Sequence, residues 1–353
     1  MDLLANAIYL DDLRRINEVS FIPWDNLRGS SILLSGATGM IGKCLVDSIM
    51  LRNREQGFGC SIFAIGRNPE KAEQRFESWW ETPLFHFIKG DVNDPSTFHI
   101  DQSIDYVIHL ASNTHPVAYA TDPIGTITAN IIGTKTLLDL AVRCKAKRFV
   151  FASSNEIYGE NRGDQELFDE SYLGYIDCNT LRAGYPESKR CGEALCQAYK
   201  EQTGLDIVIT RLTRSFGPTL LNTDTKALSQ FLKNGIHHEN IVLKSAGNQY
   251  YSYTYTDDAV TGLLTSMLKG ENGEAYNIAD ESYDIRLKDL AQIIADIANV
   301  QVIFELPNQI ESAGFSKATK ARLSGRKIRD LGWKPLMPLN QALIRTMQVR
   351  MDQ

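Results

Sequence analysis

The chain has 353 residues, of which 43% are hydrophobic and 23% are charged, an ordinary globular composition. That length allows one large α/β unit, or such a unit with a smaller lobe. The formal charge of −6 argues against a nucleic-acid-binding surface. The six cysteines include no Cys-x-x-Cys pair, so we expect neither a metal site nor a disulfide framework, and reduced thiols predict a cytoplasmic protein.

The first residues predict a helix rather than a targeting segment. They lack a basic region followed by an apolar run, and no stretch of the chain is apolar for long enough to span a membrane. We therefore expect no signal peptide and no membrane contact. Residues 1–28 have the apolar spacing of an amphipathic leader helix, which we expect to dock on the main domain or on a second subunit.

Short apolar segments then alternate with helical segments. Strands are expected at 31–35, 61–65, 85–88, 106–110, 148–152 and 206–210, and helices at 40–53, 123–145 and 185–203. This alternation predicts an α/β fold with a doubly wound parallel sheet, on which ligands bind outside the carboxyl ends of the strands.

Beyond about residue 213 the strict alternation breaks, and loops, glycines and short helices follow. We expect a smaller C-terminal α/β substrate lobe formed by residues 217–249 and 284–353. Residues 29–216 and 250–283 are expected to form the large, nucleotide-binding domain.

A glycine-rich turn follows the first strand and opens the next helix. The cofactor contacts expected there are Gly36, Thr38, Gly39, Met40, Ile41 and Gly42. Such a turn binds the pyrophosphate of a dinucleotide at the helix N-terminus. The alternative is a tight strand–helix turn that binds no ligand.

The ends of the second and third strands supply further cofactor candidates. Arg67 and Asn68 stand where a carboxylate usually meets the ribose of NAD. An arginine there suits the 2′-phosphate of NADP, or is a solvated turn residue, so the choice between NAD and NADP stays open. Asp91, followed by Val92, can accept a hydrogen bond from adenine or cap the next segment.

The fourth strand ends where the backbone is expected to pass under the cofactor. The residues expected there are Leu110, Ala111 and Ser112. His109, at the end of this strand, is interpreted as a packed residue rather than a catalyst.

Tyr185 and Lys189 lie four residues apart, so a helix places the phenol and the ammonium on one face. An ammonium near a phenol favours the phenolate, and we expect the pKa of Tyr185 to be lowered for proton abstraction from a sugar hydroxyl. Ser154, after the fifth strand, is expected to hold that hydroxyl. Glu156 is expected to be a second acid/base, with a loop or salt-bridge role as the alternative.

These motifs resemble the extended short-chain dehydrogenase/reductase family of nucleotide-sugar epimerases and dehydratases, over about Ser31 to Pro335. Supporting matches are Asp122-Pro123, Asn130-x-x-Gly133-Thr134, Phe216-Gly217-Pro218, Tyr255-Thr-Asp257-Asp258 and Leu331-Gly-Trp333-Lys-Pro335. The resemblance implies a Rossmann domain with tightly bound, recycled NAD or NADP. It also implies that Tyr185 is the base for oxidation at C4 of a hexose and that Lys189 binds the nicotinamide ribose.

Within the family, the sequence looks most like the UDP-glucuronate decarboxylases. The resemblance covers 109–123, 154–159 and 182–190. It implies cofactor contact by Asn130, and substrate contacts by His115, Asn155, Arg214, Lys226, Tyr251 and Arg286. Dehydratases generally have an aspartate in place of Asn155, which counts against dehydration.

Two departures leave the reaction open. The family usually has an asparagine where this chain has Arg214, and an arginine near the diphosphate where it has Tyr251. Arg214 is expected to supply the missing cation from the other side; otherwise the substrate is a neutral sugar and the reaction a 4-epimerisation. A 4-keto-sugar reductase and a non-catalytic binding module are further alternatives. The family also implies a homodimer through helices 123–145 and 185–203, and a role in polysaccharide biosynthesis.

Overall fold

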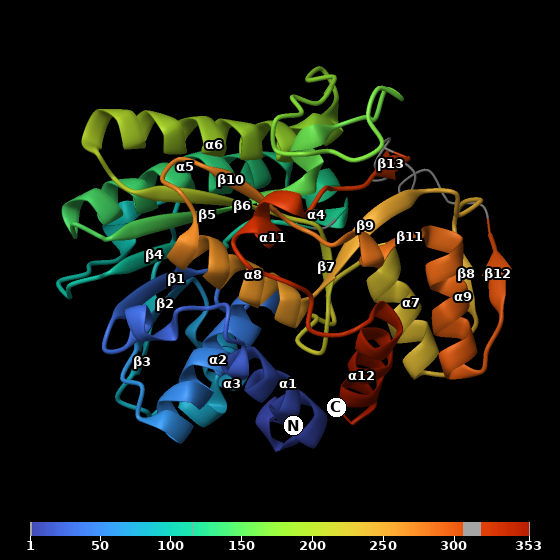
Figure 1. Cartoon of the computed structure of the whole chain (residues 1–353), viewed down its shortest axis with the longest axis horizontal. Helices are drawn as coiled ribbons and strands as arrows, with labels where there is room; N and C mark the ends of the chain where they lie inside the picture. The colour runs from blue at the N-terminus through green and yellow to red at the C-terminus, as the bar shows by residue number, and fades with distance from the viewer. Residues whose placement is uncertain (1, 115, 306–318, 353) are drawn as a thin grey trace.

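The computed structural model describes residues 2–114, 116–305 and 319–352. A seven-stranded sheet, parallel throughout, forms the larger part of the molecule (Figure 1). Its order is β3-β2-β1-β4-β5-β6-β10, with β1 Ser31–Ser35, β2 Ser61–Gly66, β3 Phe85–Lys89, β4 Tyr106–His109, β5 Arg148–Ser154, β6 Ile207–Leu212 and β10 Ala275–Ile278. The six strands expected from the sequence are present, and β10 is a seventh at the edge beside β6.

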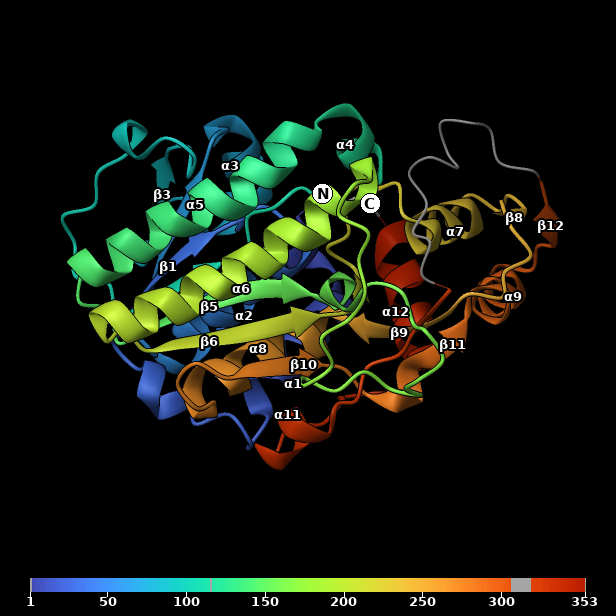
Figure 2. The ribbon, with the colours of Figure 1, turned by 90° about the horizontal axis from the view of Figure 1, so that it is seen from above.

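Apolar residues on alternate faces of the strands explain the two helical layers. Leu33 of β1 packs in one cluster with Leu137 of α5, whereas its neighbour Leu34 packs in another with Leu45 of α2. Figure 2 shows α5 and α6 side by side across one face, while α2 and α8 cover the other. This arrangement confirms the doubly wound fold.

Three helices around this sheet begin and end close to the expected residues, namely α2 Met40–Gln56, α5 Pro123–Arg143 and α6 Gly184–Thr203. Helices α3 Pro69–Arg75, α4 Pro116–Thr121 and α8 Thr256–Lys269 were not expected from the sequence. Short 3₁₀ turns lie at Glu77–Trp79, Pro95–Thr97, Asn155–Tyr158 and Leu181–Ala183. Asp122 caps α5 by accepting from the Gly125 N–H, and glycines in the left-handed conformation follow α2 and α6.

A second, smaller group of elements lies beside the carboxyl ends of the strands (Figure 2). Its strands are β7 Arg214–Phe216, β8 Ile241–Leu243, β9 Tyr250–Tyr255, β11 Asp284–Arg286, β12 Val302–Phe304 and β13 Lys320–Ala321. Its helices are α7 Ala227–Ile236, α9 Leu287–Ala298 and α12 Leu339–Met351. A 3₁₀ turn at Glu281–Tyr283 and helix α11 Arg326–Asp330 connect this group with the large sheet.

The segment 250–283 contributes to both groups. Strand β9 pairs with β7, β11 and β13, whereas α8 and β10 pack on and in the large sheet. Where the boundary between the two parts falls stays a prediction.

The leader segment joins distant elements through buried polar side chains. It contains helix α1 Ala7–Glu18 between 3₁₀ turns at Leu3–Ala5 and Trp24–Leu27. Asp12 of α1 accepts hydrogen bonds from the Tyr255 hydroxyl at 2.8 Å and from Arg345 Nε of α12 at 2.6 Å. Tyr9 donates to Asp47 of α2. The leader is therefore docked on this chain's own core. Across the described ranges, no helix is both long enough and apolar enough to cross a membrane.

Candidate active site

The glycine turn lies against the end of β4, and its geometry requires glycine. Gly36 has φ of +75°, and a Cβ on it would lie 2.6 Å from the backbone nitrogen of Ala111 and 2.7 Å from the carbonyl carbon of Leu110. A Cβ on Gly42 would lie 2.4 Å from the Gly36 oxygen. Gly39 caps α2 without any side-chain hydrogen bond, so the first N–H groups of this helix can receive a pyrophosphate.

The remaining turn residues are half-buried. Thr38, Met40 and Ile41 follow the same bend, and Met40 is held by a hydrogen bond from the Thr219 hydroxyl to its carbonyl at 2.8 Å. The turn therefore fits the pyrophosphate part of a dinucleotide. The backbone of the turn is held by the end of β4 on one side and by Thr219 on the other.

The residues at the ends of β2 and β3 make mostly local contacts. Arg67 has 74% of its side chain exposed and lies 3.9 Å from Asp91. Asn68 caps α3 by accepting from the Lys71 N–H, and Asp91 accepts from the Asn93 N–H. Val92 lies against Gly133: a Cβ added to Gly133 would lie 2.8 Å from the Val92 Cγ2 atom. Their contacts with a cofactor stay predictions.

The residues at the end of β4 carry no charge. His109 is fully buried, its Nδ1 lies 2.7 Å from the Ser35 hydroxyl, and burial lowers its pKa to about 3. The imidazole is therefore uncharged at neutral pH, as the interpretation as a packed strand residue requires. The residues that follow, Leu110, Ala111 and Ser112, are half-buried.

Asn130 links α5 to α6, the helix that carries Tyr185 and Lys189. Its amide donates to the Ser188 hydroxyl at 3.0 Å, and this hydroxyl donates to the Tyr185 carbonyl at 2.8 Å. The Asn130 Oδ1 atom is buried without a hydrogen-bond partner among the residues that the structure describes. A buried acceptor of this kind beside α6 fits a donor from a bound ligand.

Ser154, Tyr185 and Lys189 meet where β5 ends beneath α6. Tyr185 is hydrogen-bonded to Ser154, and Lys189 Nζ donates to the Ala152 carbonyl at 2.8 Å. Burial lowers the pKa of Lys189 to about 7. The predicted lowering of the Tyr185 pKa is wrong. Burial and then the charge of Glu156 raise it to about 12, although Ser154 acts in the opposite direction.

Glu156 is paired rather than free. Its carboxylate accepts from Arg182 Nη2, and both side chains are mostly buried. Arg182 stacks over Tyr119, 4.5 Å from the ring centroid, and Tyr119 lies 4.9 Å from the Tyr185 ring. Sequence reasoning assigned no role to Arg182 or Tyr119. Arg182 precedes Tyr185 by one helical turn, which was a usable signal.

Arg214 and Tyr251 complete the other side of this site. The guanidinium carbon of Arg214 lies 3.5 Å from the Tyr251 ring centroid, across the pairing of β7 with β9. Burial raises the pKa of Tyr251, and the charges of Arg214, Glu156 and Arg182 all act on it. The structure thus brings Glu156, Arg214 and Tyr251 together, and the role of Arg214 as the missing cation for the substrate stays a prediction.

The other expected substrate contacts are more scattered. Asn155 is buried in the 3₁₀ turn after β5, Lys226 pairs with Asp224 at 3.2 Å, and the charge of Asp224 acts on Tyr119. Arg286 is exposed and donates to the Asn248 carbonyl. His115 lies outside the described residues.

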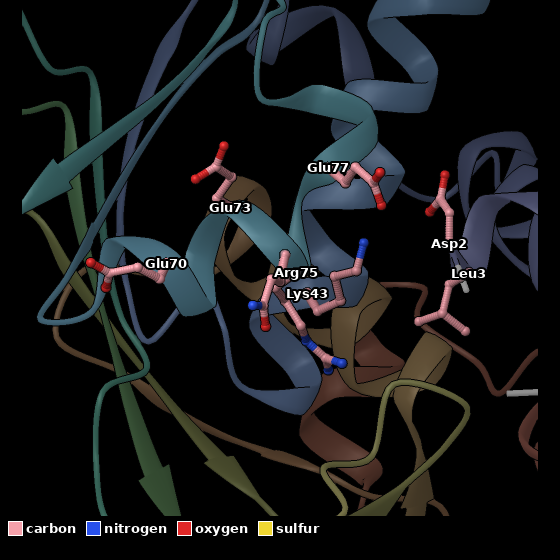
Figure 3. A pocket seen from close by; sticks show the side chains of 8 residues that line it. Asp2, Leu3, Lys43, Glu70, Glu73, Arg75 and Glu77 are labelled. Carbon is pink, nitrogen blue, oxygen red and sulfur yellow. The ribbon is translucent and has the colours of Figure 1, made fainter.

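A separate hollow of about 710 Å³ lies between the leader and α3 (Figure 3). Its lining residues are Asp2, Leu3, Lys43, Glu70, Glu73, Gln74, Arg75 and Glu77. None of the predicted site residues lines it. Within the described part of the chain, no group of three or more His, Cys, Asp or Glu side chains could hold a metal ion.

Comparisons with known proteins agree with this fold. The model of the NAD dependent epimerase/dehydratase family matches residues 32–279, and the chain belongs to this family of enzymes. The expected family and fold class are confirmed.

Individual relatives match over most of this chain. The chain is 28% identical over 312 residues to UDP-glucuronic acid decarboxylase 5 of Arabidopsis thaliana, which covers 88% of this chain and 86% of the relative. It is 30% identical over 318 residues to UDP-glucuronic acid decarboxylase 1 of Danio rerio, and this match covers 90% of this chain and 72% of the relative. The structure of a dTDP-glucose 4,6-dehydratase from Streptomyces venezuelae matches with a TM-score of 0.77 at 23% identity. The match covers 92% of this chain and 97% of the dehydratase, so the two share the fold.

Proposed function

We propose that the chain is a decarboxylase of UDP-glucuronate that acts through a 4-keto intermediate. The observation that carries the proposal is the pairing of Glu156 with Arg182 beside Tyr185, with a second guanidinium, that of Arg214, close by. A sugar carboxylate brought to this place meets two positive charges and one negative charge. The relatives named as decarboxylases support the same reaction.

The proposed chemistry starts at C4 of the sugar. Tyr185 takes the proton of the 4-hydroxyl, which Ser154 helps to hold. A dinucleotide bound at the glycine turn would supply the hydride chemistry at C4, both the oxidation and the later reduction. The ketone at C4 makes the glucuronate a β-keto acid, and such an acid loses carbon dioxide readily. Loss of carbon dioxide leaves an enolate, and C5 must then gain a proton. Glu156 is placed to direct this proton transfer to C5, while Arg182 holds the Glu156 carboxylate in position.

The residues at the glycine turn fit a dinucleotide. The uncapped start of α2 would hold the pyrophosphate, and Lys189 and Asn130 would hold the nicotinamide ribose and its surroundings. The hydrogen bond with Ser154 and the positive charge of Arg182 favour ionisation of Tyr185, against the burial that raises its pKa. The family makes NAD the proposed cofactor, and Arg67, which suits a 2′-phosphate, is the residue that would favour NADP instead.

A 4-epimerase acting on a neutral hexose is the second candidate. The observation that favours it is Tyr251, which stands where the family usually has an arginine and offers one neutral hydrogen bond instead of two charged ones.

The homodimer and the cytoplasmic location also stay proposals. Exposed Ile124 and Ile132 on α5 support the dimer.

The test is chromatographic separation, which resolves isomers of equal mass, followed by mass spectrometry of the products formed from UDP-glucuronate, UDP-glucose and UDP-galactose with NAD and with NADP. Loss of carbon dioxide from UDP-glucuronate is the expected result. Glu156→Gln should abolish this loss, and Tyr185→Phe should stop all turnover. A neutral sugar converted at unchanged mass, with UDP-glucuronate left intact, would instead identify a 4-epimerase and remove Glu156 from the chemistry.

A further inference from the structure

Arg182 uses only part of its hydrogen-bonding capacity within the protein. Its Nη2 donates to Glu156, and its plane stacks on Tyr119. Its Nε and Nη1 atoms are buried and have no hydrogen-bond partner among the described residues. A buried guanidinium with two unsatisfied nitrogens is costly, because each N–H loses its water without a replacement.

Arg214 shows the same feature from the opposite side. Its Nη1 is buried and has no partner among the residues that the structure describes. It stacks on Tyr251, and the charges of both Arg214 and Arg182 act on that ring's hydroxyl. The unsatisfied N–H groups of two arginines, one from the turn before α6 and one from β7, therefore border one region.

The charges in this region do not balance. Glu156 contributes one negative charge, against one positive charge each from Arg182 and Arg214. The nearby Lys226 and Asp224 already pair with each other at 3.2 Å. One further anion would neutralise the region, whereas a neutral sugar would leave a guanidinium uncompensated next to buried aromatic rings.

We propose that Arg182 and Arg214 form a two-arginine site that binds the carboxylate of a uronosyl group and selects uronate sugars over neutral hexoses. Carboxylates and phosphates share the chemistry that a guanidinium recognises, so the diphosphate of the substrate is the competing source of the anion. The position of Arg182 favours the sugar. Only the Tyr119 ring separates it from Tyr185, which acts on the sugar hydroxyl. The inference rests on the proposed function in one respect, that a nucleotide sugar occupies this site.

The test is calorimetric binding of UDP, UDP-glucose and UDP-glucuronate to the NAD-loaded protein. A Tyr185→Phe background keeps each sugar intact during the measurement. The ratio of the Kd for UDP-glucose to the Kd for UDP-glucuronate measures the selectivity for the carboxylate. Arg182→Gln and Arg214→Gln should each reduce this ratio by about tenfold or more, since each removes a charge-assisted hydrogen bond. Affinity for UDP should change little, and Arg182→Lys should restore part of the ratio.

Arg148→Gln is the matched control, because Arg148 also forms a mostly buried ion pair, with Asp206, but lies at the opposite end of β5. It should leave the ratio unchanged. A ratio that does not favour UDP-glucuronate in the parent protein, or that survives either substitution, would overturn the proposal. An equal loss for all three ligands would assign the arginines to the diphosphate, and an equal fall of the ratio in Arg148→Gln would show a general structural effect; either result also overturns it.

These outcomes are separable from those of the proposed function. A uronate that is bound selectively but epimerised, with its carboxylate retained, would refute decarboxylation and keep the two-arginine site. Decarboxylation combined with an unchanged ratio of the two Kd values in Arg182→Gln would refute the two-arginine site and keep the proposed reaction.

Discussion

The close approach of the glycine turn to β4 can be tested with a matched pair of substitutions, Gly36→Ala and Gly57→Ala. Both glycines have positive φ, +75° and +57°. A Cβ on Gly57 would meet nothing within 4 Å, so alanine there carries only the left-handed backbone cost, about 1 to 2 kcal/mol. A Cβ on Gly36 would come within 2.6 Å of Ala111 N and 2.7 Å of Leu110 C. Both are backbone atoms, so crowding adds about 1 to 3 kcal/mol and the total is about 2 to 5 kcal/mol.

Chemical denaturation would give the free energies of unfolding, and calorimetry the Kd for NAD. Gly36→Ala should be the more destabilising substitution, and it should weaken NAD binding by about tenfold or more because it shifts the backbone beneath the pyrophosphate. Gly57→Ala should leave the Kd for NAD unchanged. If the two variants lose equal stability and bind NAD alike, the reasoning from the close approach fails.

Three further predictions concern charged residues. Burial lowers the pKa of Lys189 from 10.5 to about 7, so the unfolded chain binds the extra proton between these values. Stability relative to Lys189→Met should therefore rise as pH increases from 7 to 10 in nucleotide-free protein, and a flat difference in melting temperature would contradict the shift. Arg345→Met should lower the free energy of unfolding by about 3 kcal/mol in urea titrations, because it leaves the fully buried Asp12 without its cation; a loss under about 1 kcal/mol would mean that Asp12 is neutral. Arg67→Ala should leave the Kd for NAD within about twofold, since the side chain is mostly exposed; a rise of about tenfold in the Kd for NADP alone would show that Arg67 binds a 2′-phosphate.

Much of the large sheet could be predicted because its strands are buried on both faces. Segments such as 31–35 and 148–152 are continuous apolar runs between clear turns, and they require no knowledge of distant contacts. Strand β10, with the sequence Ala-Tyr-Asn-Ile, is short and at the edge, and β7 has only three residues. Their pairing with β6 and β9 decides their structure, and that information is not local.

The candidate site divides in the same way. The spacing of Tyr185 and Lys189 gave their shared helix face, but it did not give their burial, and burial sets both pKa values. The stacking of Arg182 on Tyr119 joins residues from different elements. The contact of Arg214 with Tyr251 was foreseeable only because both positions depart from the family pattern in a compensating way.

The bond between Asp12 and Arg345 also has a consequence for synthesis of the protein. The two residues are 333 positions apart, and a ribosome that adds roughly 5 to 20 residues per second needs on the order of tens of seconds to make the second after the first. During this interval α1 cannot complete its network, and its apolar side is available to chaperones and to other nascent chains. The leader is thus synthesised early, but its bond to Arg345 forms late, and conditions that slow elongation should expose the leader for longer.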